Sequence, residues 1–484
     1  MASSILRRSA EPSSGLDIMR GTRRRTATLV VVIAFASLVL ACLLFRPDRA
    51  LRTATGSAAH DLCSETFVSQ LDPEQVFVES LSPRPGFRWI AWAVNHRVDP
   101  TRREAHASLL GALPSRAVFR DGVGCVLVHG DEPIATAKLR GAVHAAPLLP
   151  AIAGPVAVEA SDPRLKAAVD TAFQEAQRPP YANTKAIVIV HDGRVIAERY
   201  AQGYGVNTPI LGFSMTKSVV NALIGILVRE RKLAVDAPAP VAAWSGNADL
   251  RRTITVEQLM RMDSGLALNE TGSGFDPSNQ MFYDEPDMAG YAQRAALVAA
   301  PGTRWSYSSA STHLLARIVR DRVGGTAESV QRFAFNELFD VLGMRSVTLE
   351  MDATGTPIGA HYMLASARDW ARFGSLYLDD GVVGGRRVLP EGWVKFSTTP
   401  TLGTAYGAGW WTDRGGSSAA PGQVKAGLPA DAFFAFGNLG QRIAVVPSER
   451  LVIVRMARSH LPHGGTKAFE ALVIEVISSL RPVR

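Results

Sequence analysis

The chain has 484 residues, of which 47% are hydrophobic and 20% charged, so it can build a sizeable core and is not disordered as a whole. Its formal charge of +8 is uneven, because residues 1–49 hold eight arginines against three acidic residues, a balance of +5 that leaves +3 for the rest. Since the excess lies at the N-terminus and no basic stripe or nucleic-acid motif follows, the composition does not favour a nucleic-acid partner.

The N-terminus has the pattern of a membrane anchor. Residues 1–25 are rich in Ser and Arg and predict a disordered cytoplasmic tail, whereas residues 26–45 carry no charge. Twenty helical residues span about 30 Å, which is the thickness of the hydrocarbon core of a bilayer. Because Arg23, Arg24 and Arg25 precede this segment, the positive-inside rule keeps that end cytoplasmic. We therefore expect a single-pass cell-membrane protein whose remaining chain lies on the periplasmic or extracellular side.

Cleavage of this segment is the alternative. Residues 39–42, V-L-A-C, loosely resemble a lipobox, which would make Cys42 a lipidated N-terminus, although the apolar run continues to Phe45. The other two cysteines, Cys63 and Cys125, lie in the exported part and are candidates for a disulfide, with two free buried thiols as the alternative. No His or Cys cluster has ligand spacing, so neither a metal nor another cofactor is predicted.

Residues 46–155 are predicted to be an exported region of unassigned role. It begins with a juxtamembrane linker at 46–60, contains short strand-like runs at 87–94 and 124–130, and ends in the Pro/Ala-rich stretch 145–155.

Residues 156–484 predict a second unit with strands at both ends and helices between them. Two strands are expected at 185–200 around Asp192-Gly193, and three more at 432–437, 441–447 and 450–456. Helical patterns occupy 164–176, 214–227, 255–263, 288–299, 310–322, 327–340 and 467–480. This order favours an α+β fold (an α/β sandwich), with one antiparallel sheet built from both ends of the unit, flanking helices and an inserted all-helical region.

Ser214 and Lys217 stand where the apolar helix 214–227 begins. Residues three apart share a helix face, so the hydroxyl lies beside the amine. Serine is a weak nucleophile until a base removes its proton, and a buried amine of lowered pKa can be that base. A serine N-cap followed by a solvated lysine is the plainer interpretation, but the mostly apolar helix favours a buried lysine, which needs a partner. A second polar group, Tyr307, precedes the helix at 310–322, and a tyrosine can act as a base when nearby cations stabilise its phenolate. Taken alone, Tyr307 is more simply interpreted as a packed aromatic residue.

Ser214-x-x-Lys217, Tyr307-x-Ser309 and a Gly-containing terminal strand, in this order, resemble the serine β-lactamase and penicillin-binding superfamily. The resemblance is nearest to class C β-lactamase-like esterases and amidases of the 6-aminohexanoate-dimer hydrolase type, and covers about residues 162–484. It implies that Ser214 is the acylated nucleophile, that Lys217 tunes it and moves its proton, and that Tyr307 is general base and then acid. Ser309 would contact Lys217 or the substrate, and backbone N–H groups of Ser214 and the terminal strand would form the oxyanion hole.

The third motif departs from the family pattern. The β-lactamases carry K-T-G there, whereas this chain has Ala435-Phe436-Gly437, with Asn438 as the expected oxyanion-hole donor. Competing alignments use Asn438-Leu439-Gly440 or, at greater distance from the following strand, Lys425-Ala426-Gly427. Without a lysine at the favoured position, the resemblance favours uncharged amide or ester substrates over β-lactams.

The polar segment 269–288 predicts a loop over the site. The resemblance to the aminohexanoate hydrolases implies that Tyr283 of this loop contacts substrate, with a surface-packed tyrosine as the alternative. Its acidic residues Asp284, Glu285 and Asp287 would either attract an amine or form a solvated face. The sequence thus predicts a membrane-anchored serine hydrolase acting on a small amide or ester. The alternatives are a β-lactamase or penicillin-binding activity, and a non-catalytic membrane-tethered ligand sensor.

Overall fold

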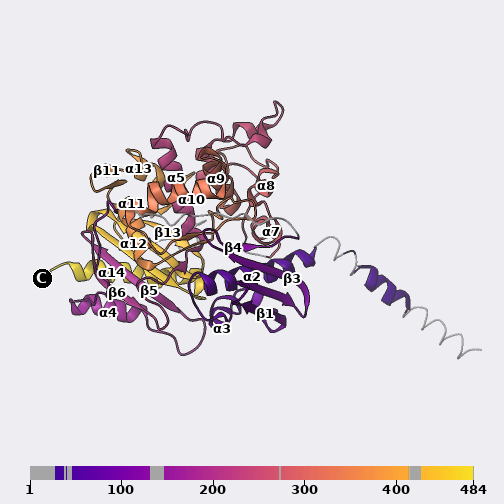
Figure 1. Ribbon diagram of the computed structural model, residues 1–484, viewed down its shortest axis with the longest axis horizontal. Helices are drawn as coiled ribbons and strands as arrows, with labels where there is room; N and C mark the ends of the chain where they lie inside the picture. The colour runs from indigo at the N-terminus through magenta and orange to yellow at the C-terminus, as the bar shows by residue number, and fades with distance from the viewer. Residues whose placement is uncertain are drawn as a thin grey trace, which may run out of the picture. The chain divides into compact units, whose positions relative to one another are not determined.

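The computed structural model describes residues 28–37, 40, 46–130, 146–271, 274–412, 414 and 427–482, and Figure 1 traces them in chain order. Residues 1–50 and residues 51–484 form two compact units. In the first unit, residues 28–37 are helical and exposed. Within the described ranges, no helix combines the length and hydrophobicity that a membrane crossing requires. The predicted anchor at 26–45 and Cys42 lie partly or wholly outside these ranges.

A six-stranded antiparallel sheet organises residues 156–484, and its strand order is β12-β13-β14-β15-β5-β6. Its strands are β12 (Trp411–Thr412), β13 (Phe433–Gly437), β14 (Gln441–Val446), β15 (Leu451–Ala457), β5 (Thr184–His191) and β6 (Arg194–Tyr200). The C-terminal strand β15 pairs with the N-terminal strand β5, with Ile453 opposite Ile189. The prediction of one sheet built from both ends of this unit is therefore confirmed.

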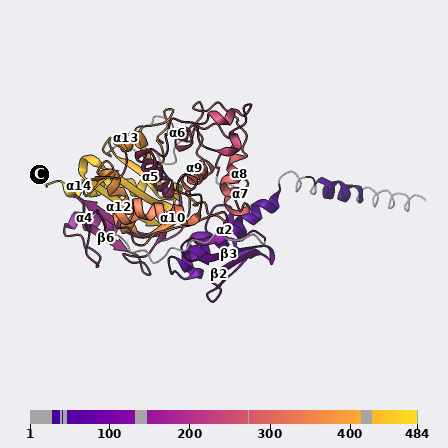
Figure 2. The same ribbon diagram turned by 45° about the horizontal axis from the view of Figure 1, so that its top comes forward.

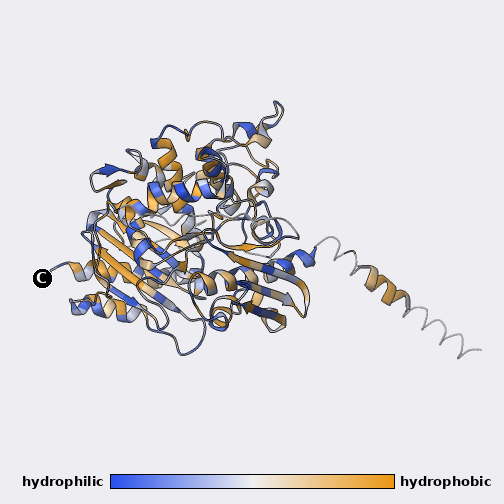
Figure 3. Ribbon diagram, in the orientation of Figure 1, coloured by the Kyte–Doolittle hydropathy of each residue, from blue (hydrophilic) through white to orange (hydrophobic). Residues whose placement is uncertain are grey.

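Helices cover both faces of this sheet, which explains why its central strands are hydrophobic runs (Figure 3). Leu451 and Ile453 of β15 point to one core, shared with α4 (Pro163–Ala172) and α14 (Thr466–Leu480). Val452 and Val454 point to the other core, shared with α12 (Ala367–Leu378). The alternation of side chains along each strand thus divides the core into two layers.

The inserted region is mostly helical, and Figure 2 shows its helices α5, α6 and α9 together. The prediction of an all-helical insertion is wrong in this respect, because short strands pair within it. Its helices are α5 (Thr216–Arg229), α6 (Val256–Met260), α7 (Pro277–Asp284), α8 (Met288–Gln293), α9 (Ser309–Arg322), α10 (Ala327–Ala334), α11 (Asp340–Leu342) and α13 (Trp393–Thr398). Short strands complete it: β7 (Ile210–Leu211), β9 (Met363–Ala365) and β8 (Thr348–Leu349) form one sheet, and β10 (Val382–Val383) pairs with β11 (Arg386–Arg387).

The region before residue 130 is more ordered than the sequence suggested. The expected linker at 46–60 is wrong, because α2 runs over Pro47–Phe67 and is followed by α3 (Pro73–Val76). The expected strand at 87–94 is also wrong: short 3-10 turns occupy 87–93, with Trp89 and Trp92 exposed. A four-stranded meander follows, made of β1 (Val94–Asp99), β2 (Glu104–Leu109), β3 (Ala112–Arg120) and β4 (Gly124–Leu127).

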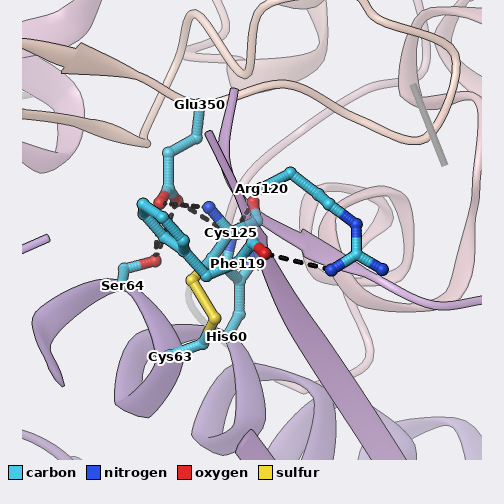
Figure 4. The surroundings of a disulfide bond; sticks show 7 residues. All are labelled: His60, Cys63, Ser64, Phe119, Arg120, Cys125 and Glu350. Atoms are coloured by element: carbon cyan, nitrogen blue, oxygen red, sulfur yellow. Dashed lines mark hydrogen bonds and ion pairs between the residues drawn. A yellow bond between two sulfur atoms is a disulfide. The ribbon is translucent and has the colours of Figure 1, made fainter. Parts of the chain in front are cut away.

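A disulfide links two elements of this region, and a buried carboxylate joins the region to the rest of the 51–484 unit. Cys63 of α2 is bonded to Cys125 of β4, with the two Cα atoms 6.0 Å apart. Beside it, Figure 4 shows Glu350, whose carboxylate accepts hydrogen bonds from the Cys125 N–H at 2.8 Å and the Ser64 hydroxyl at 2.8 Å. His60 Nε2 lies 3.0 Å from the same carboxylate. Residues 51–130 therefore share one interior with the helical region, and α2 lies beside α7 in Figures 1 and 2.

Candidate active site

Ser214 lies in a one-turn 3-10 segment, Phe213–Met215, that leads into α5. The preceding residue, Phe213, has φ of +48°, a left-handed conformation that strains a non-glycine residue and that often marks functional sites. Gly212 precedes it and donates its N–H to the Met363 carbonyl at 2.8 Å, which fixes the turn to β9. A Cβ at Gly212 would overlap the Trp370 ring, so only glycine fits there. The turn leaves Ser214 partly accessible while its neighbours are buried.

Lys217 points at Ser214 from the first turn of α5. Its Nζ lies 3.0 Å from Ser214 Oγ, 3.0 Å from Ser309 Oγ and 3.1 Å from the Ala360 carbonyl oxygen. All three partners are uncharged, and the side chain is buried. Burial lowers the pKa of Lys217 from its ordinary value to about 8, with the charge of Glu270 acting in the opposite direction. A sizeable neutral fraction is therefore present near pH 8, and a neutral amine here can accept the Ser214 proton.

Tyr307 closes the other side of this cluster. Its ring lies under the Lys217 ammonium, with Nζ 4.8 Å from the ring centroid, and it stacks on Trp411. Burial raises the pKa of the Tyr307 phenol well above its ordinary value, and its hydrogen bond with Ser214 lowers it only in part. The phenol is consequently neutral at ordinary pH. This differs from the phenolate that the sequence suggested, because Lys217 faces the ring rather than stabilising a phenolate oxygen by an ion pair.

Glu270 is a site residue that the sequence analysis missed. Its Oε2 accepts a hydrogen bond from the backbone N–H of Ser309 at 2.8 Å and from the hydroxyl of Ser278 at 3.3 Å. It thereby fixes the start of α9, where Ser309 meets Lys217. The signal was available, since Asn269-Glu270 opens the polar segment after an apolar run. Two of the acids that were singled out instead serve structure: Asp287 caps α8 and Glu285 pairs with Arg294 at 3.1 Å.

A cleft of about 1600 Å3 opens over Ser214. Trp305, Tyr307, Trp411 and Phe436 form an aromatic part of its lining. Gly437 and Asn438, at the end of β13, line it as well, so the structure brings the predicted terminal-strand residues to the cleft that holds Ser214.

The glycine that lies against the nucleophile turn is Gly437. A Cβ there would overlap the Gly212 carbonyl oxygen, so a side chain would push β13 away from the turn. Gly440, the competing candidate, packs instead against Arg455 and the Gly464 carbonyl. In the third alignment, Lys425 lies outside the described residues, and Gly427 packs near Ile474 of α14. The first of the three alignments is therefore the one that the packing favours.

Tyr283 does not lie where the sequence predicted. The expected loop 269–288 contains α7, which begins because Asp276 caps it, accepting from the Asn279 N–H at 2.9 Å, and Pro277 takes its first position. Tyr283 is buried at the end of α7, and its hydroxyl lies 3.2 Å from the Tyr362 hydroxyl. Burial raises its pKa, and it is absent from the described lining of the cleft. Its predicted contact with substrate is therefore wrong for this arrangement.

Residues 169–474 match the model of the family described as Beta-lactamase. A 6-aminohexanoate-dimer hydrolase of Paenarthrobacter ureafaciens is 28% identical over 238 residues, which are 45% of this chain and 58% of that protein. The chain thus matches less than two thirds of the length of this relative.

Two solved structures share the fold. A candidate 6-aminohexanoate-dimer hydrolase of Bacillus anthracis has a TM-score of 0.54 at 24% identity, covering 70% of this chain and 90% of its own. A penicillin-binding protein homologue of Caulobacter crescentus has a TM-score of 0.51 at 18% identity, covering 66% and 99%. At these identities the likeness concerns the fold and not the substrate.

Proposed function

The chain belongs to the Beta-lactamase family, and from this premise we propose that it is a serine hydrolase that cleaves an amide or ester through an acyl-enzyme on Ser214. The observation that carries the proposal is the contact of Lys217 Nζ with Ser214 Oγ at 3.0 Å, made by a buried amine whose pKa is lowered to about 8. A structural lysine would instead pair with an acid or reach solvent.

In the proposed first step, neutral Lys217 takes the Ser214 proton while Oγ attacks the carbonyl carbon of the substrate. The carbonyl π electrons move to oxygen, and this oxyanion accepts hydrogen bonds from the backbone N–H groups of Ser214 and Asn438. The tetrahedral intermediate then expels the amine or alcohol. Neutral Tyr307 donates its proton to that leaving group and recovers one from protonated Lys217.

Water hydrolyses the acyl-enzyme by the same steps in reverse. It attacks the ester carbon, gives its proton to the Lys217–Tyr307 pair, and Ser214 Oγ leaves with a proton. Ser309, held by Glu270, keeps the Lys217 amine directed at the Oγ atom throughout. The roles differ from the sequence-based hypothesis in one respect: Lys217 is the base, because burial makes it the easier of the two groups to deprotonate at neutral to mildly alkaline pH.

Amides and esters are the proposed substrates. The strand β13 carries Ala435-Phe436-Gly437 where β-lactam-specific members of the resembling superfamily carry lysine, and the relative in Paenarthrobacter ureafaciens is named for an amide dimer. The β-lactamase or penicillin-binding alternative requires that fluorescent penicillin label Ser214, and the sensor alternative requires that no acylating reagent does.

We also propose that residues 26–45 anchor the protein in the cell membrane with residues 46–484 outside the cytoplasm. The absence of charge in this segment, the preceding arginines and the Cys63–Cys125 disulfide all support this, since disulfides persist in oxidising compartments. Fractionation of cells, with protease added to intact cells or spheroplasts, tests it. Recovery of the protein in the soluble cytoplasmic fraction would contradict it.

The decisive experiment for the enzyme is intact-mass analysis of the purified full chain after treatment with a fluorophosphonate, beside Ser214→Ala and Ser264→Ala. Ser264 is the control, because it is a buried serine that does not line the described cleft. We expect one adduct on the parent and on Ser264→Ala, and none on Ser214→Ala. A folded parent without an adduct would overturn the hydrolase proposal and favour the sensor.

A further inference from the structure

The cleft over Ser214 has a wall that comes from outside the family domain. Val78, Pro83, Pro85 and Arg88 line it, and all four precede residue 169, where the family match begins. No motif in the sequence assigns a role to this part of the chain. Its place in the cleft gives it direct access to whatever Ser214 acts on.

This wall is firmly attached to the hydrolase part. His460 Nε2 lies 2.8 Å from the Glu79 carbonyl oxygen, and Lys185 of β5 forms an ion pair with the Glu79 carboxylate at 2.8 Å. On the inner side, Arg84 pairs with Asp61 at 2.5 Å, and its guanidinium lies over the ring of Phe213, 5.9 Å from the centroid. The wall thus touches the residue directly before Ser214, so it belongs to the same preorganised cleft.

The acidic groups of the cleft are already engaged. Glu79 is paired with Lys185, and Glu175 accepts backbone hydrogen bonds from Ala182 and Asn183 at 2.8 and 2.5 Å. Glu270 holds the start of α9. These carboxylates are therefore compensated by the protein and are poor anchors for a cationic substrate.

The two arginines of the cleft differ in burial and in the partners of their guanidinium groups. Arg442 is buried, and its guanidinium donates to the carbonyls of Gly437 and His463 and to Thr466. Arg88 is exposed, and its guanidinium stacks on the Trp89 ring, 4.7 Å from the centroid. Among the described residues, no acid is found within ion-pair distance of Arg88. Stacking restricts the side chain while leaving its N–H donors open to a ligand.

We propose that Arg88 binds a carboxylate of the substrate, so that the enzyme selects amides or esters that carry an anionic group separated from the scissile bond by an apolar chain. The inference rests on the proposed hydrolase function and names its substrate class. Arginine presents a planar fork that matches a carboxylate, and Val78, Pro83 and Pro85 offer an apolar surface to the chain between. Arg88 would then supply the positive charge for a substrate carboxylate that the lysine of K-T-G supplies in the β-lactamases and that the third motif of this chain lacks.

The test uses matched substrates on the full chain. In one pair the anionic member carries its carboxylate on the acyl side: p-nitrophenyl monoadipate, with p-nitrophenyl hexanoate as its neutral counterpart. The other places it on the leaving-group side: N-hexanoyl-6-aminohexanoate and N-hexanoyl-pentylamine. In at least one pair, we expect Arg88→Ala to lower kcat/KM of the anionic member about 10- to 100-fold and to change the neutral member less than threefold. Arg88→Glu should then prefer an analogue that ends in an ammonium group. Arg97→Ala, which removes an exposed arginine of β1 outside the cleft lining, should leave both ratios unchanged.

Binding to Ser214→Ala separates this inference from the proposed function. Calorimetry should show that the anionic amide binds at least tenfold more weakly when Arg88→Ala is added. If Arg88→Ala weakens this binding but the parent protein hydrolyses none of the four substrates, the Arg88 site is supported and the hydrolase proposal is overturned. Hydrolysis and binding whose anionic-to-neutral ratios are unchanged by Arg88→Ala would overturn the Arg88 site and leave the hydrolase in place.

Discussion

The Lys217 amine lies 3.0 Å from the hydroxyl oxygen of Ser214 and 3.0 Å from that of Ser309, and both hydroxyls are held by the starts of helices. Burial lowers the pKa of this lysine to about 8, and none of the described residues places a carboxylate in direct contact with the amine to offset it. The pH dependence of the reaction should follow this group.

We expect kcat/KM for a neutral ester to rise with pH and to level off above about pH 8, because the unprotonated amine is the active form. Below that value the rate should fall about tenfold per pH unit, as for a single required deprotonation. Lys217→Met should abolish this fall of kcat/KM at lower pH and should reduce kcat/KM by at least about 10³-fold. A plateau that extends unchanged to pH 6 in the parent would show that Lys217 is not the base.

Glu270→Gln should move this pH profile to lower pH. The Glu270 carboxylate raises the pKa of Lys217, opposing the effect of burial, and glutamine removes the charge while keeping an oxygen that can accept from the Ser309 N–H. The midpoint should therefore fall, while the rate on the alkaline plateau changes little. Glu257→Gln serves as the control, since Glu257 pairs with Arg261 outside the cleft lining. An unchanged midpoint in Glu270→Gln would contradict the electrostatic link.

Tyr307→Phe should separate amides from activated esters. The ring and its stacking on Trp411 remain, but the proton donor for the leaving group is lost. We expect a loss of about 10²- to 10⁴-fold for amides and a smaller loss for p-nitrophenyl esters, whose leaving group needs no protonation. Tyr200→Phe, which removes a hydroxyl bonded to Glu198 on β6, is the control. Equal losses on both substrate types would assign the phenol a packing role instead.

Gly437→Ala should impair catalysis while the protein stays folded. A Cβ at this position overlaps the Gly212 carbonyl oxygen, so the end of β13 must move away from Ser214 and carry the Asn438 N–H with it. Loss of one oxyanion-hole donor lowers kcat by about 10²–10³. Gly154→Ala is the matched control because nothing lies near a Cβ there. Full activity of a folded Gly437→Ala would place the second oxyanion donor elsewhere.

Removal of the disulfide by Cys63→Ala with Cys125→Ala should cost about 2–5 kcal/mol of stability. Reductant should lower the Tm of the parent and leave that of the double variant unchanged. Thermal unfolding followed by circular dichroism, with and without dithiothreitol, measures both. Insensitivity of the parent to reductant would mean that the bond does not form in the isolated protein.

The sequence allowed the central sheet to be predicted because β5, β14 and β15 each contain an apolar run of at least four residues next to a clear turn. Ser214 and Lys217 could be paired because they are local, three residues apart on one helix. Glu270 opens the polar segment 269–288, but neither its role nor that of Arg88 could be assigned from local pattern, because their significance comes from neighbours that only folding brings near. Tyr283 was misplaced because a capped helix formed inside a segment whose polarity suggested a loop. Helix α2 was missed because its sequence is nearly as polar as a linker, and it is buried through contacts such as Ser64 with Glu350, 286 residues later.

That contact has a consequence for how the protein is made. Residues 51–130 are synthesised before residue 350, yet the Ser64 hydroxyl and the Cys125 N–H find their acceptor only when Glu350 has been made. Until then these two buried polar groups lack that partner, which disfavours early closure of α2 onto β4. The N-terminal region is therefore expected to become protease-resistant late, together with the hydrolase part, and a chain stopped before residue 350 should remain open to digestion. The N-terminal region and the hydrolase part would thus fold together in one step, after the Glu350 carboxylate has become available.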